Sequence, residues 1–398
     1  MAFPLEGVRI ISVEQYGAGP FGTLHLADLG AEVIKIENPT EGGDVGRFVR
    51  HPDDPLATGD SMFHQAFNRN KRSITLNLKH PKGRDLYHRL VQTADVAFNN
   101  LRGDLPDKLG LTYDALKAVN ERVVCVHLSA YGRANERAGW PGYDYLMQAE
   151  CGYLSLTGDP EGPPSRLGLS MVDLSSGLQS AIAMLAGIVG ARASGKGGDY
   201  DISLFDAAIA NLAYVGAWYL TAGVNTGRAT RSAHPSLTPS QLYRTRDGWI
   251  FIMCNKEKFW PALCTALGRA ELASDPDFST FAERLRNRDR LTNFLDEALS
   301  EHTTAEWLQH FSGTVPAAPV NDIAGALEAP FTRSTGQIVS YGAPDGTTVT
   351  TTGPAIRLPG VAPLTRAAPP LAGDLDAVMA ELGIDTAELA ALKAEGVC

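Results

Sequence analysis

The hydrophobic positions in the first part of the chain alternate between two spacings, which predicts strands and helices in turn. Short, nearly continuous apolar runs are typical of strands buried on both faces of a sheet. These runs lie at residues 8–13, 31–36, 74–78, 94–98 and 123–128. Between them, residues 21–29 and 81–92 carry apolar positions at helical spacing. Because alternating strands and helices form parallel sheets, the pattern predicts an α/β domain with a Rossmann-like parallel sheet.

A long helix is predicted to begin close to Asp173. Apolar residues recur at spacings of three to four from Leu178 to Val189, and the glycine-rich sequence after Ser194 ends the pattern. A helix N-terminus stabilises an anion by about 0.3–1 kcal/mol, so we expect the pKa of Asp173 to be lowered by less than about one unit. Two interpretations of Asp173 remain open: a capping residue of the helix, or an ionised nucleophile for an acyl group.

The composition changes after residue 222 and predicts a second, smaller domain. Residues 1–222 form the first part of the large domain, and residues 223–240 read as a linker because they are rich in Gly, Thr, Ser and Pro. Residues 241–330 combine a hairpin signal with amphipathic helices, which is typical of a small α+β domain. We expect residues 331–398 to return to the large domain and to end in helices.

Composition and charge restrict the class of protein. The hydrophobic fraction of 44% and the charged fraction of 20% are ordinary for a globular chain. A net charge of −10 argues against binding to nucleic acid or to a membrane surface. The five cysteines are scattered and show no metal-ligand spacing, so we expect reduced thiols and no metal. With no leader-like segment and no apolar run near the ~20 residues of a membrane span, the sequence predicts a cytoplasmic protein without a membrane partner.

A glycine-bearing turn follows the first predicted strand. The sequence GAGPFG from Gly17 superficially fits the dinucleotide motif GxGxxG, although Pro20 removes one N–H from the start of the helix. A single glycine pattern is weak evidence for NAD, since the glycines could simply allow a strand and a helix to pack closely. An NAD-binding or non-catalytic α/β protein therefore remains an alternative.

Several sequence blocks resemble one enzyme family. In order, they are AGPFGT, LADLGAEVIKIE, NRNKRSITLNLK, the GYD that ends at Asp144, the segment around Asp173, GKG, and HPSLTPSQLYRTRDGWI. In this order they resemble the family III CoA-transferases, which include the formyl-CoA:oxalate and carnitine CoA-transferases and are related to the α-methylacyl-CoA racemases. The resemblance covers most of the chain.

The resemblance implies an activity and a mechanism. CoA would be transferred from an acyl-CoA thioester to a free carboxylic acid, and Asp173 would be the nucleophile that carries an aspartyl-CoA intermediate. Neither a metal nor a permanently bound cofactor is implied, because the CoA thioesters are substrates. The family also implies a homodimer in which two chains interlock.

The resemblance and the strand ends together suggest contacts to CoA. Gln15 and Ala18 lie in the glycine-bearing turn, and the family uses this turn to bind the adenosine or pantetheine part. In the family, the residues that match Asn100 and Lys108 contact CoA beyond the end of a strand. Three residues at a strand entrance could hold phosphate or ribose, or could form a solvated turn: Asn70, Lys71 and Arg72.

Tyr143 bears on the main alternative, an acyl-CoA racemase or epimerase. Racemase relatives have a histidine at this position, which acts as one of two bases. Tyrosine has an ordinary pKa of about 10 and is a poor base at neutral pH, so Tyr143 favours a transferase. The neighbouring Asp144 could be a second carboxylate that orients a substrate near Asp173, or an ordinary loop residue.

Overall fold

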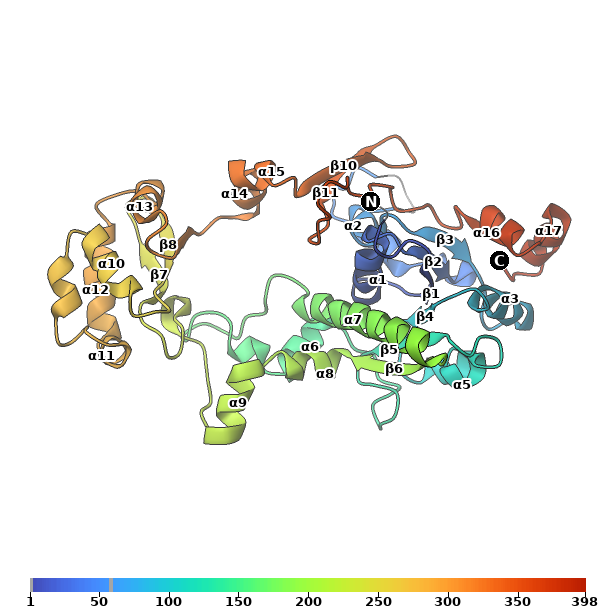
Figure 1. The fold of residues 1–398 in the computed structure, drawn as a ribbon, viewed down its shortest axis with the longest axis horizontal. Coiled ribbons are helices and arrows are strands. Elements are labelled where there is room, and N and C mark those ends of the chain that lie inside the picture. The colour runs from blue at the N-terminus through green and yellow to red at the C-terminus, as the bar shows by residue number, and fades with distance from the viewer. Residues whose placement is uncertain (1–2, 57–59) are drawn as a thin grey trace. The chain divides into compact units, whose positions relative to one another are not determined.

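The computed structural model describes residues 3–56 and 60–398, and these form two compact units. The larger unit comprises Met1–Cys151, Gly168–Ala213 and Pro330–Cys398. The smaller unit comprises Gly152–Leu167 and Tyr214–Ala329. The chain returns to the larger unit after residue 329. The smaller unit additionally contains Gly152–Leu167, which lie within the range expected for the large domain (Figure 1).

A parallel sheet forms the centre of the larger unit, as the sequence predicts, and it has six strands. Its strand order is β3-β2-β1-β4-β5-β6, so the order reverses between β1 and β4. The strands are β1 (Arg9–Val13), β2 (Glu32–Glu37), β3 (Arg72–Thr75), β4 (Val96–Asn99), β5 (Val124–Ser129) and β6 (Gly198–Ser203). Open sheets of this kind bind ligands beyond the carboxyl ends of the strands at the reversal.

Helices cover both faces of this sheet (Figure 1). On one face lie α1 (Ala18–Asp28) and α7 (Met171–Ser194), which pack against each other. On the other face lie α3 (Pro81–Val91), α16 (Leu375–Glu381) and α17 (Thr386–Ala394). Successive residues of a strand point to opposite faces of the sheet. In β5, Val124 faces α7, because a Cβ at Gly187 of α7 would touch it, whereas Cys125 belongs to the core on the α3 face.

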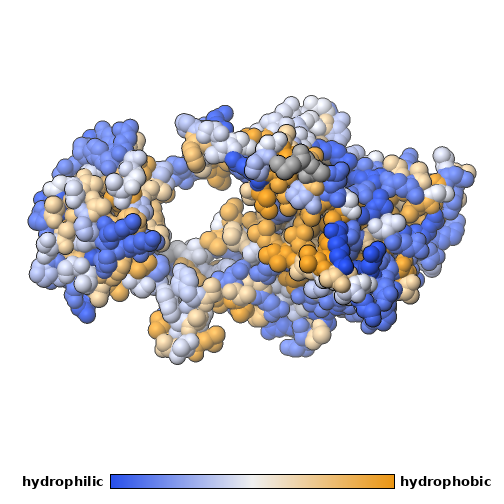
Figure 2. Space-filling view, viewed as in Figure 1, coloured by the Kyte–Doolittle hydropathy of each residue, from blue (hydrophilic) through white to orange (hydrophobic). Residues whose placement is uncertain are grey.

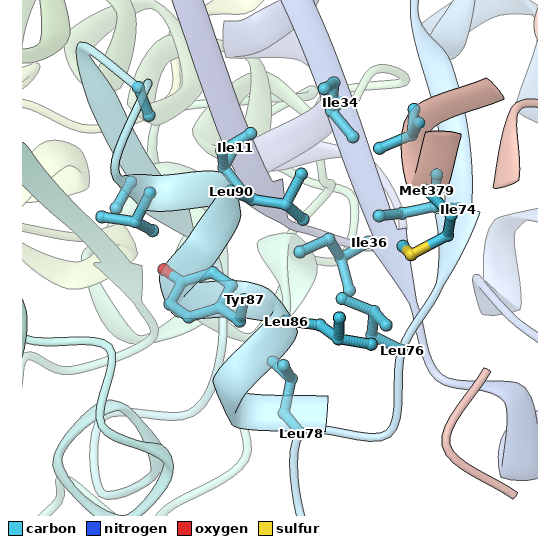
Figure 3. Close-up of a cluster of buried hydrophobic side chains, with 14 of the residues drawn as sticks. Ile11, Ile34, Ile36, Ile74, Leu76, Leu78, Leu86, Tyr87, Leu90 and Met379 are labelled. Atoms are coloured by element: carbon cyan, nitrogen blue, oxygen red, sulfur yellow. The ribbon is translucent and has the colours of Figure 1, made fainter. Parts of the chain in front are cut away.

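The core on the α3 face is dense and aliphatic (Figure 3). Leu86, Tyr87 and Leu90 of α3 lie against isoleucines of three neighbouring strands, and Met379 of α16 closes one side. The isoleucines are Ile11, Ile34, Ile36 and Ile74. This packing fixes β1, β2 and β3 as a rigid platform below the loops at their carboxyl ends.

Shorter elements of the larger unit flank the sheet. They are α2 (Met62–Asn68), α4 (Leu105–Leu109), α5 (Tyr113–Leu116), α6 (Asp144–Glu150), α8 (Leu204–Ala210) and α15 (Pro330–Ser334). Strands β10 (Ile338–Gly342) and β11 (Thr348–Thr352) form an antiparallel hairpin whose turn contains Asp345 and Gly346. Helix α9 (Ala213–Ala222) follows where the chain passes to the smaller unit.

The smaller unit has its own sheet and core. An antiparallel sheet of order β7-β8-β9 is formed by Ser240–Arg244, Trp249–Met253 and Ala317–Pro319. Its helices are α10 (Phe259–Ala266), α11 (Phe281–Arg286), α12 (Arg288–Leu299), α13 (Thr304–Phe311) and α14 (Ile323–Glu328). Trp260, Trp307 and Tyr243 are the largest side chains of its core. The predicted α+β character of this part is therefore present in the structure.

Helix α7 corrects one expectation from the sequence. Among the described residues it is long and apolar enough, at 24 residues, to cross a membrane by length and composition. Its packing against α1 and the sheet is also typical of a core helix, so this is weak evidence for a membrane segment. Its apolar character has a structural use, because α7 carries Asp173 in its first turn.

Candidate active site

Asp173 lies in the first turn of α7 and is buried, with 5% of its surface exposed. The helix begins at Met171, and the residue at the N-cap position is Ser170, whose side chain makes no capping hydrogen bond. The capping interpretation of Asp173 is therefore wrong. Its carboxyl group is left available, because the free N–H groups of the helix end are satisfied by another residue.

That residue is Asp144, at the start of α6. One carboxylate oxygen, Oδ2, accepts hydrogen bonds from the backbone N–H groups of Val172 (2.7 Å) and Asp173 (3.0 Å). The other, Oδ1, accepts from the Gln148 side-chain amide at 2.5 Å, and Gln148 also donates to the Leu169 carbonyl. Asp144 is 3% exposed. It therefore caps α7 from a neighbouring helix and fixes the direction in which α7 presents Asp173.

The electrostatic environment of Asp173 opposes its ionised form. Burial raises the pKa of Asp173 to about 7, and the negative charge of Asp144 acts in the same direction. Asp173 forms no ion pair with any described residue in 3–56 or 60–398. The expectation of a slightly lowered pKa is therefore wrong, because desolvation outweighs the ~0.3–1 kcal/mol that a helix end provides. A poorly solvated carboxylate is a better nucleophile than one in water.

Glycines bring α1 and α7 into direct backbone contact. A Cβ at Gly22 would lie 2.5 Å from the Gly177 carbonyl oxygen, and a Cβ at Gly177 would lie 2.5 Å from the Ala18 carbonyl oxygen. At the start of α1, a Cβ at Gly17 would lie 3.2 Å from Oδ2 of Asp173. The glycines of the first turn thus allow close packing, and they place the Asp173 carboxyl group against the turn that follows β1.

A cavity of about 200 Å³ opens at this point, beyond the carboxyl ends of β1, β4 and β5. Four of the residues predicted for the site line it with Asp173: Gln15, Ala18, Asn100 and Tyr143. Segments 100–102, 128–130 and 140–143 complete the wall. The cavity lies where the strand order reverses, which is the usual ligand position in such sheets.

The side chain of Asn100 holds the turn that follows β1. Its side-chain oxygen accepts from the Gln15 N–H at 2.8 Å, and its Nδ2 donates to the Gln15 carbonyl at 2.7 Å. A Cβ at Gly19 would come within 2.7 Å of the same side chain. Because both polar atoms of the Asn100 amide are engaged, this residue holds the turn in place at the edge of the cavity.

A second cavity of about 230 Å³ lies beyond the carboxyl ends of β1 and β2 and beside residues 76–79, just after β3. It shares Gln15 and Leu101 with the first cavity, so the two adjoin. The exposed cation in its wall is Lys79, which was not among the predicted site residues. A long ligand could occupy both cavities and pass Gln15 between them.

The basic residues predicted at the entrance of β3 line neither of these two cavities. Lys71 is fully buried, and its Nζ donates to Glu14 (2.8 Å) and to the Pro20 carbonyl (2.9 Å). Arg72 pairs with Glu32 (2.6 Å) and Glu381 (2.8 Å). Burial lowers the pKa of Lys71 to about 8, against the opposing effect of Glu14. The Lys71 ammonium lies behind the turn that follows β1, and Arg72 pairs with residues of β2 and α16, so internal carboxylates occupy both cations.

Asn70 and Lys108 also differ from the expected contacts. Asn70 adopts a left-handed backbone with a φ of 65°, and its amide donates to Asp28 at 2.8 Å. Lys108 is exposed and pairs with Asp104 at 2.6 Å. The basic residue that does line the first cavity beside this pair is Arg102, which also binds Asp104.

Sequence reasoning missed Tyr16, which lies between the predicted residues Gln15 and Ala18. It lines the same cavity as Asp173, and its backbone is left-handed with a φ of 64°. Its ring contacts those of Phe63 and Tyr143, with centroids 5.1 Å and 6.2 Å away. No local sequence signal indicates this conformation, because a left-handed tyrosine is a rare exception to the backbone preferences of bulky residues.

A buried carboxyl group at the reversal of a parallel α/β sheet, facing a glycine turn and a ligand-sized cavity, is typical of an enzyme with a nucleophilic aspartate. Comparison with known proteins specifies the class. The sequence profile of CoA-transferase family III matches residues 5–374, so the chain belongs to this family and is a CoA-transferase. The resemblance noted from the sequence is confirmed, and the NAD-binding alternative is not supported.

Named relatives and solved structures agree with this assignment. The chain is 33% identical over 388 residues to a succinate–glutarate CoA-transferase of Agrobacterium fabrum, which covers 95% of this chain and 96% of the relative. It is 34% identical over 342 residues to an acetyl-CoA:oxalate CoA-transferase of Acetobacter aceti, covering 85% and 86%. A crystal structure of a CAIB/BAIF family protein from Brucella suis is 33% identical, with a TM-score of 0.81 and coverage of 96% and 100%.

Proposed function

We propose that this enzyme transfers CoA from an acyl-CoA thioester to a free carboxylic acid through a covalent aspartyl-CoA intermediate on Asp173. One observation carries the proposal: a buried carboxyl group, without a cationic partner among the described residues, lines a cavity large enough for the end of a thioester. With a pKa of about 7, Asp173 is partly ionised at neutral pH and poorly solvated when it is.

The transfer follows from the chemistry of this carboxylate. An oxygen of Asp173 attacks the thioester carbonyl carbon, and the C–S bond breaks. CoA leaves as a thiolate, and the acyl group remains on Asp173 as a mixed anhydride. The thiolate attacks the Asp173 carbonyl carbon, and the donor acid leaves as a carboxylate. The acceptor carboxylate then attacks the aspartyl-CoA thioester, and the steps run in reverse until Asp173 is a free carboxylate again.

The surrounding residues keep the route productive. Asp144 holds the end of α7 through the N–H groups of Val172 and Asp173, so the nucleophile cannot swing away from the cavity. Gly17 leaves room for the reacting carbonyl beside Asp173. Water must be excluded during transfer, because hydrolysis of either intermediate would waste the thioester.

The two adjoining cavities suggest how CoA binds. The nucleotide part would occupy the second cavity near Lys79, and the pantetheine chain would pass Gln15, Ala18 and Leu101 to reach Asp173. Tyr143 would cover the reacting end. We propose no direct CoA contact for Lys71 and Arg72, since internal ion pairs occupy both.

Dicarboxylic acids are the first acids to test. The relatives are named for succinate, glutarate and oxalate as transfer partners. A panel of succinyl-CoA and acetyl-CoA as donors with glutarate, oxalate and malate as acceptors would identify the preferred pair.

The racemase alternative makes a distinct prediction. It requires a second base, and the residue at the corresponding place is Tyr143, which is 62% exposed. Solvent deuterium appearing at the α-carbon of an acyl-CoA, without transfer to any acid, would favour a racemase over a transferase.

The decisive experiment traps the intermediate. Incubation with acyl-CoA and hydroxylamine should convert Asp173 to a hydroxamate that peptide mass spectrometry locates. Asp173→Ala should abolish transfer and trapping, whereas Asp322→Ala, at a helix cap in the smaller unit, should retain both. Full transfer by Asp173→Ala would refute the proposed nucleophile.

A second copy of the chain is the proposed partner. Figure 2 shows an apolar surface over the position of α7 in Figure 1, and exposed apolar side chains of this helix include Leu178, Ile182 and Val189. Ile182 and Val189 are 64% and 69% exposed. Contiguous apolar surface of this kind marks an interaction site, and it supports the interlocked homodimer implied by the family.

A further inference from the structure

Tyr16 is held in an unusual backbone conformation directly before the glycine that faces Asp173. Its φ of 64° lies in the left-handed region, which bulky side chains avoid because Cβ crowds the backbone. Such conformations persist where the surrounding structure enforces them, and they concentrate at functional sites. The next residue, Gly17, is the one whose Cβ would contact Oδ2 of Asp173.

A buried ion pair enforces this conformation. The Tyr16 N–H donates to Oδ1 of Asp44 at 2.8 Å, and Oδ2 of Asp44 accepts from the Lys35 ammonium at 2.5 Å. The Asp44 N–H in turn donates to Glu37 at 2.8 Å. Asp44, Lys35 and Glu37 are each at most 3% exposed. The charges are therefore fixed in a dry interior, and they fix the backbone of Tyr16 in turn.

Tyr16 lines the cavity that contains Asp173, and it lies close enough for the charge of Asp173 to affect the pKa of its hydroxyl. Its ring lies between those of Phe63 and Tyr143, and both Tyr16 and Asp173 line the cavity wall. The Tyr16 hydroxyl has no hydrogen-bond partner among residues 3–56 and 60–398. Burial, together with the charge of Asp173, raises the pKa of Tyr16 above 10, so the hydroxyl keeps its proton throughout the neutral range.

Two other polar side chains in the cavity wall, Asn100 and Arg102, are already engaged. The Asn100 amide donates to the Gln15 carbonyl, and the Arg102 guanidinium binds the Asp104 carboxylate. Tyr16 therefore supplies a neutral, protonated donor beside the nucleophile, which is the chemical requirement for stabilising a developing oxyanion.

We infer that the Tyr16 hydroxyl donates a hydrogen bond to the acyl carbonyl oxygen when Asp173 attacks, an inference that rests on the proposed transfer mechanism. The oxygen becomes negative as the C–O bond to Asp173 forms, and it returns to a carbonyl as the C–S bond breaks. No proton is transferred. The same hydrogen bond serves each acyl group that passes through the site, so it does not select among acids.

Replacement of the hydroxyl tests this role. Tyr16→Phe keeps the ring contacts and should lower the single-turnover rate about 10²-fold, the usual effect of removing one oxyanion donor. The loss should be similar for every acid that the wild-type enzyme accepts. The Kd for CoA and the pH midpoint set by Asp173 should not change. The matched control is Tyr113→Phe on α5, which removes a hydroxyl that donates to the Glu121 carbonyl. It should retain the wild-type rate.

A second variant separates the hydroxyl from the backbone strain. Tyr16→Gly introduces a residue that adopts the left-handed region without strain and carries no side-chain donor, so the rate should remain low. A folded Tyr16→Gly enzyme that recovers the wild-type rate would contradict the inference.

Three other results would overturn the inference. They are an unchanged rate in Tyr16→Phe, a loss confined to one acid, and an upward shift of the pH midpoint, which would mean that the hydroxyl binds the Asp173 carboxylate. If the wild-type enzyme transfers no CoA, the proposed function itself fails. If it transfers CoA and Tyr16→Phe matches it, only the role of Tyr16 fails.

Discussion

Asp144 accepts a hydrogen bond from the backbone N–H of Asp173 at 3.0 Å, so one buried carboxylate holds the helix end that presents the other. The same proximity has an electrostatic effect, since the charge of Asp144 adds to burial in raising the pKa of Asp173 to about 7. Asp144 therefore affects both the position of Asp173 and, together with burial, the pH at which Asp173 ionises.

Asp144→Asn separates these two effects. The asparagine oxygen can still accept from the N–H groups of Val172 and Asp173, but the negative charge is lost. The pKa of Asp173 should fall toward its ordinary value, and the pH midpoint of transfer should move below 7. Initial rates measured between pH 5 and 9 would show the shift, and an unchanged midpoint would contradict it.

Asp144→Ala removes the acceptor as well. Loss of a helix cap costs about 0.5–2 kcal/mol, so the melting temperature should fall. Asp322→Ala is the matched control, because Asp322 caps α14 by accepting from the Gly325 N–H at 2.7 Å. This control should lose similar stability without any change in the pH midpoint.

Asp173→Asn should stabilise the fold at high pH while abolishing transfer. Burial raises the pKa of this acid, so the folded state binds more protons than the unfolded state between pH 3.8 and about 7. The contribution of Asp173 to the free energy of unfolding therefore falls as pH rises through that window, by about 4 kcal/mol at most. Because the neutral asparagine avoids this cost, the variant should melt higher than the wild-type enzyme at pH 8. The difference should vanish near pH 4, and equal melting temperatures at pH 8 would contradict the assigned burial cost.

The elements that the sequence predicted correctly depend on local patterns. The apolar runs of β1, β2 and β5 and the helical spacing of α7 are visible without tertiary information, because both faces of those strands are buried. Strand β6 was not predicted, since it is an edge strand whose sequence GDYDIS alternates charged and apolar positions. His127 of β5 is buried, and its ring bonds to the side chains of Asn99 and Asp199.

The errors at the site have a tertiary origin. Lys71 was expected near phosphate because a cation at a strand entrance is usually solvated, yet Glu14 from a distant part of the chain buries it. The pKa of Asp173 was expected to fall because a helix end is visible in the sequence, whereas its burial is not. Tyr16 could not be found, because its backbone conformation depends on tertiary contacts such as the hydrogen bond of its N–H to Asp44.

Gly177→Ala should displace α1 from α7. The added Cβ would lie 2.5 Å from the Ala18 carbonyl oxygen, and neither backbone can yield easily. Overpacking of this kind costs about 1–3 kcal/mol, and the movement would also separate Asp173 from the turn at Gly17, so the transfer rate should fall with stability. Thermal melts and initial rates would measure both effects.

Gly190→Ala is the control on the same helix. Its Cβ would meet only the Tyr200 hydroxyl at 3.9 Å, and alanine is favoured over glycine within helices by about 1 kcal/mol. This variant should be as stable as the wild-type enzyme or more so, with full activity. Equal melting temperatures and transfer rates in the two variants would show that the close contact of α1 and α7 at Gly177 affects neither stability nor activity.

Lys71→Met should destabilise the protein without weakening CoA binding by the folded fraction. The variant leaves Glu14 buried without its partner, and breaking a buried ion pair costs about 3–5 kcal/mol. Thr23 would remain a donor to Glu14, at 2.8 Å, so partial compensation is expected. Denaturant titration would give the loss of stability, and calorimetric titration with CoA would give the affinity. Lys79→Met, at the wall of the second cavity, should show the opposite behaviour, with normal stability and weaker CoA binding.

Ile182→Glu tests whether a second copy covers α7. Ile182 is 64% exposed in the single chain, so a glutamate is tolerated there, but it would become an unpaired charge within an apolar dimer interface. The variant should sediment as a monomer at concentrations where the wild-type protein is a dimer. Lys196→Glu, at the exposed end of the same helix, changes charge without entering the apolar surface and should remain dimeric. A dimeric Ile182→Glu protein would exclude this face of α7 from the interface, because no packed apolar contact accommodates a carboxylate without separating the chains.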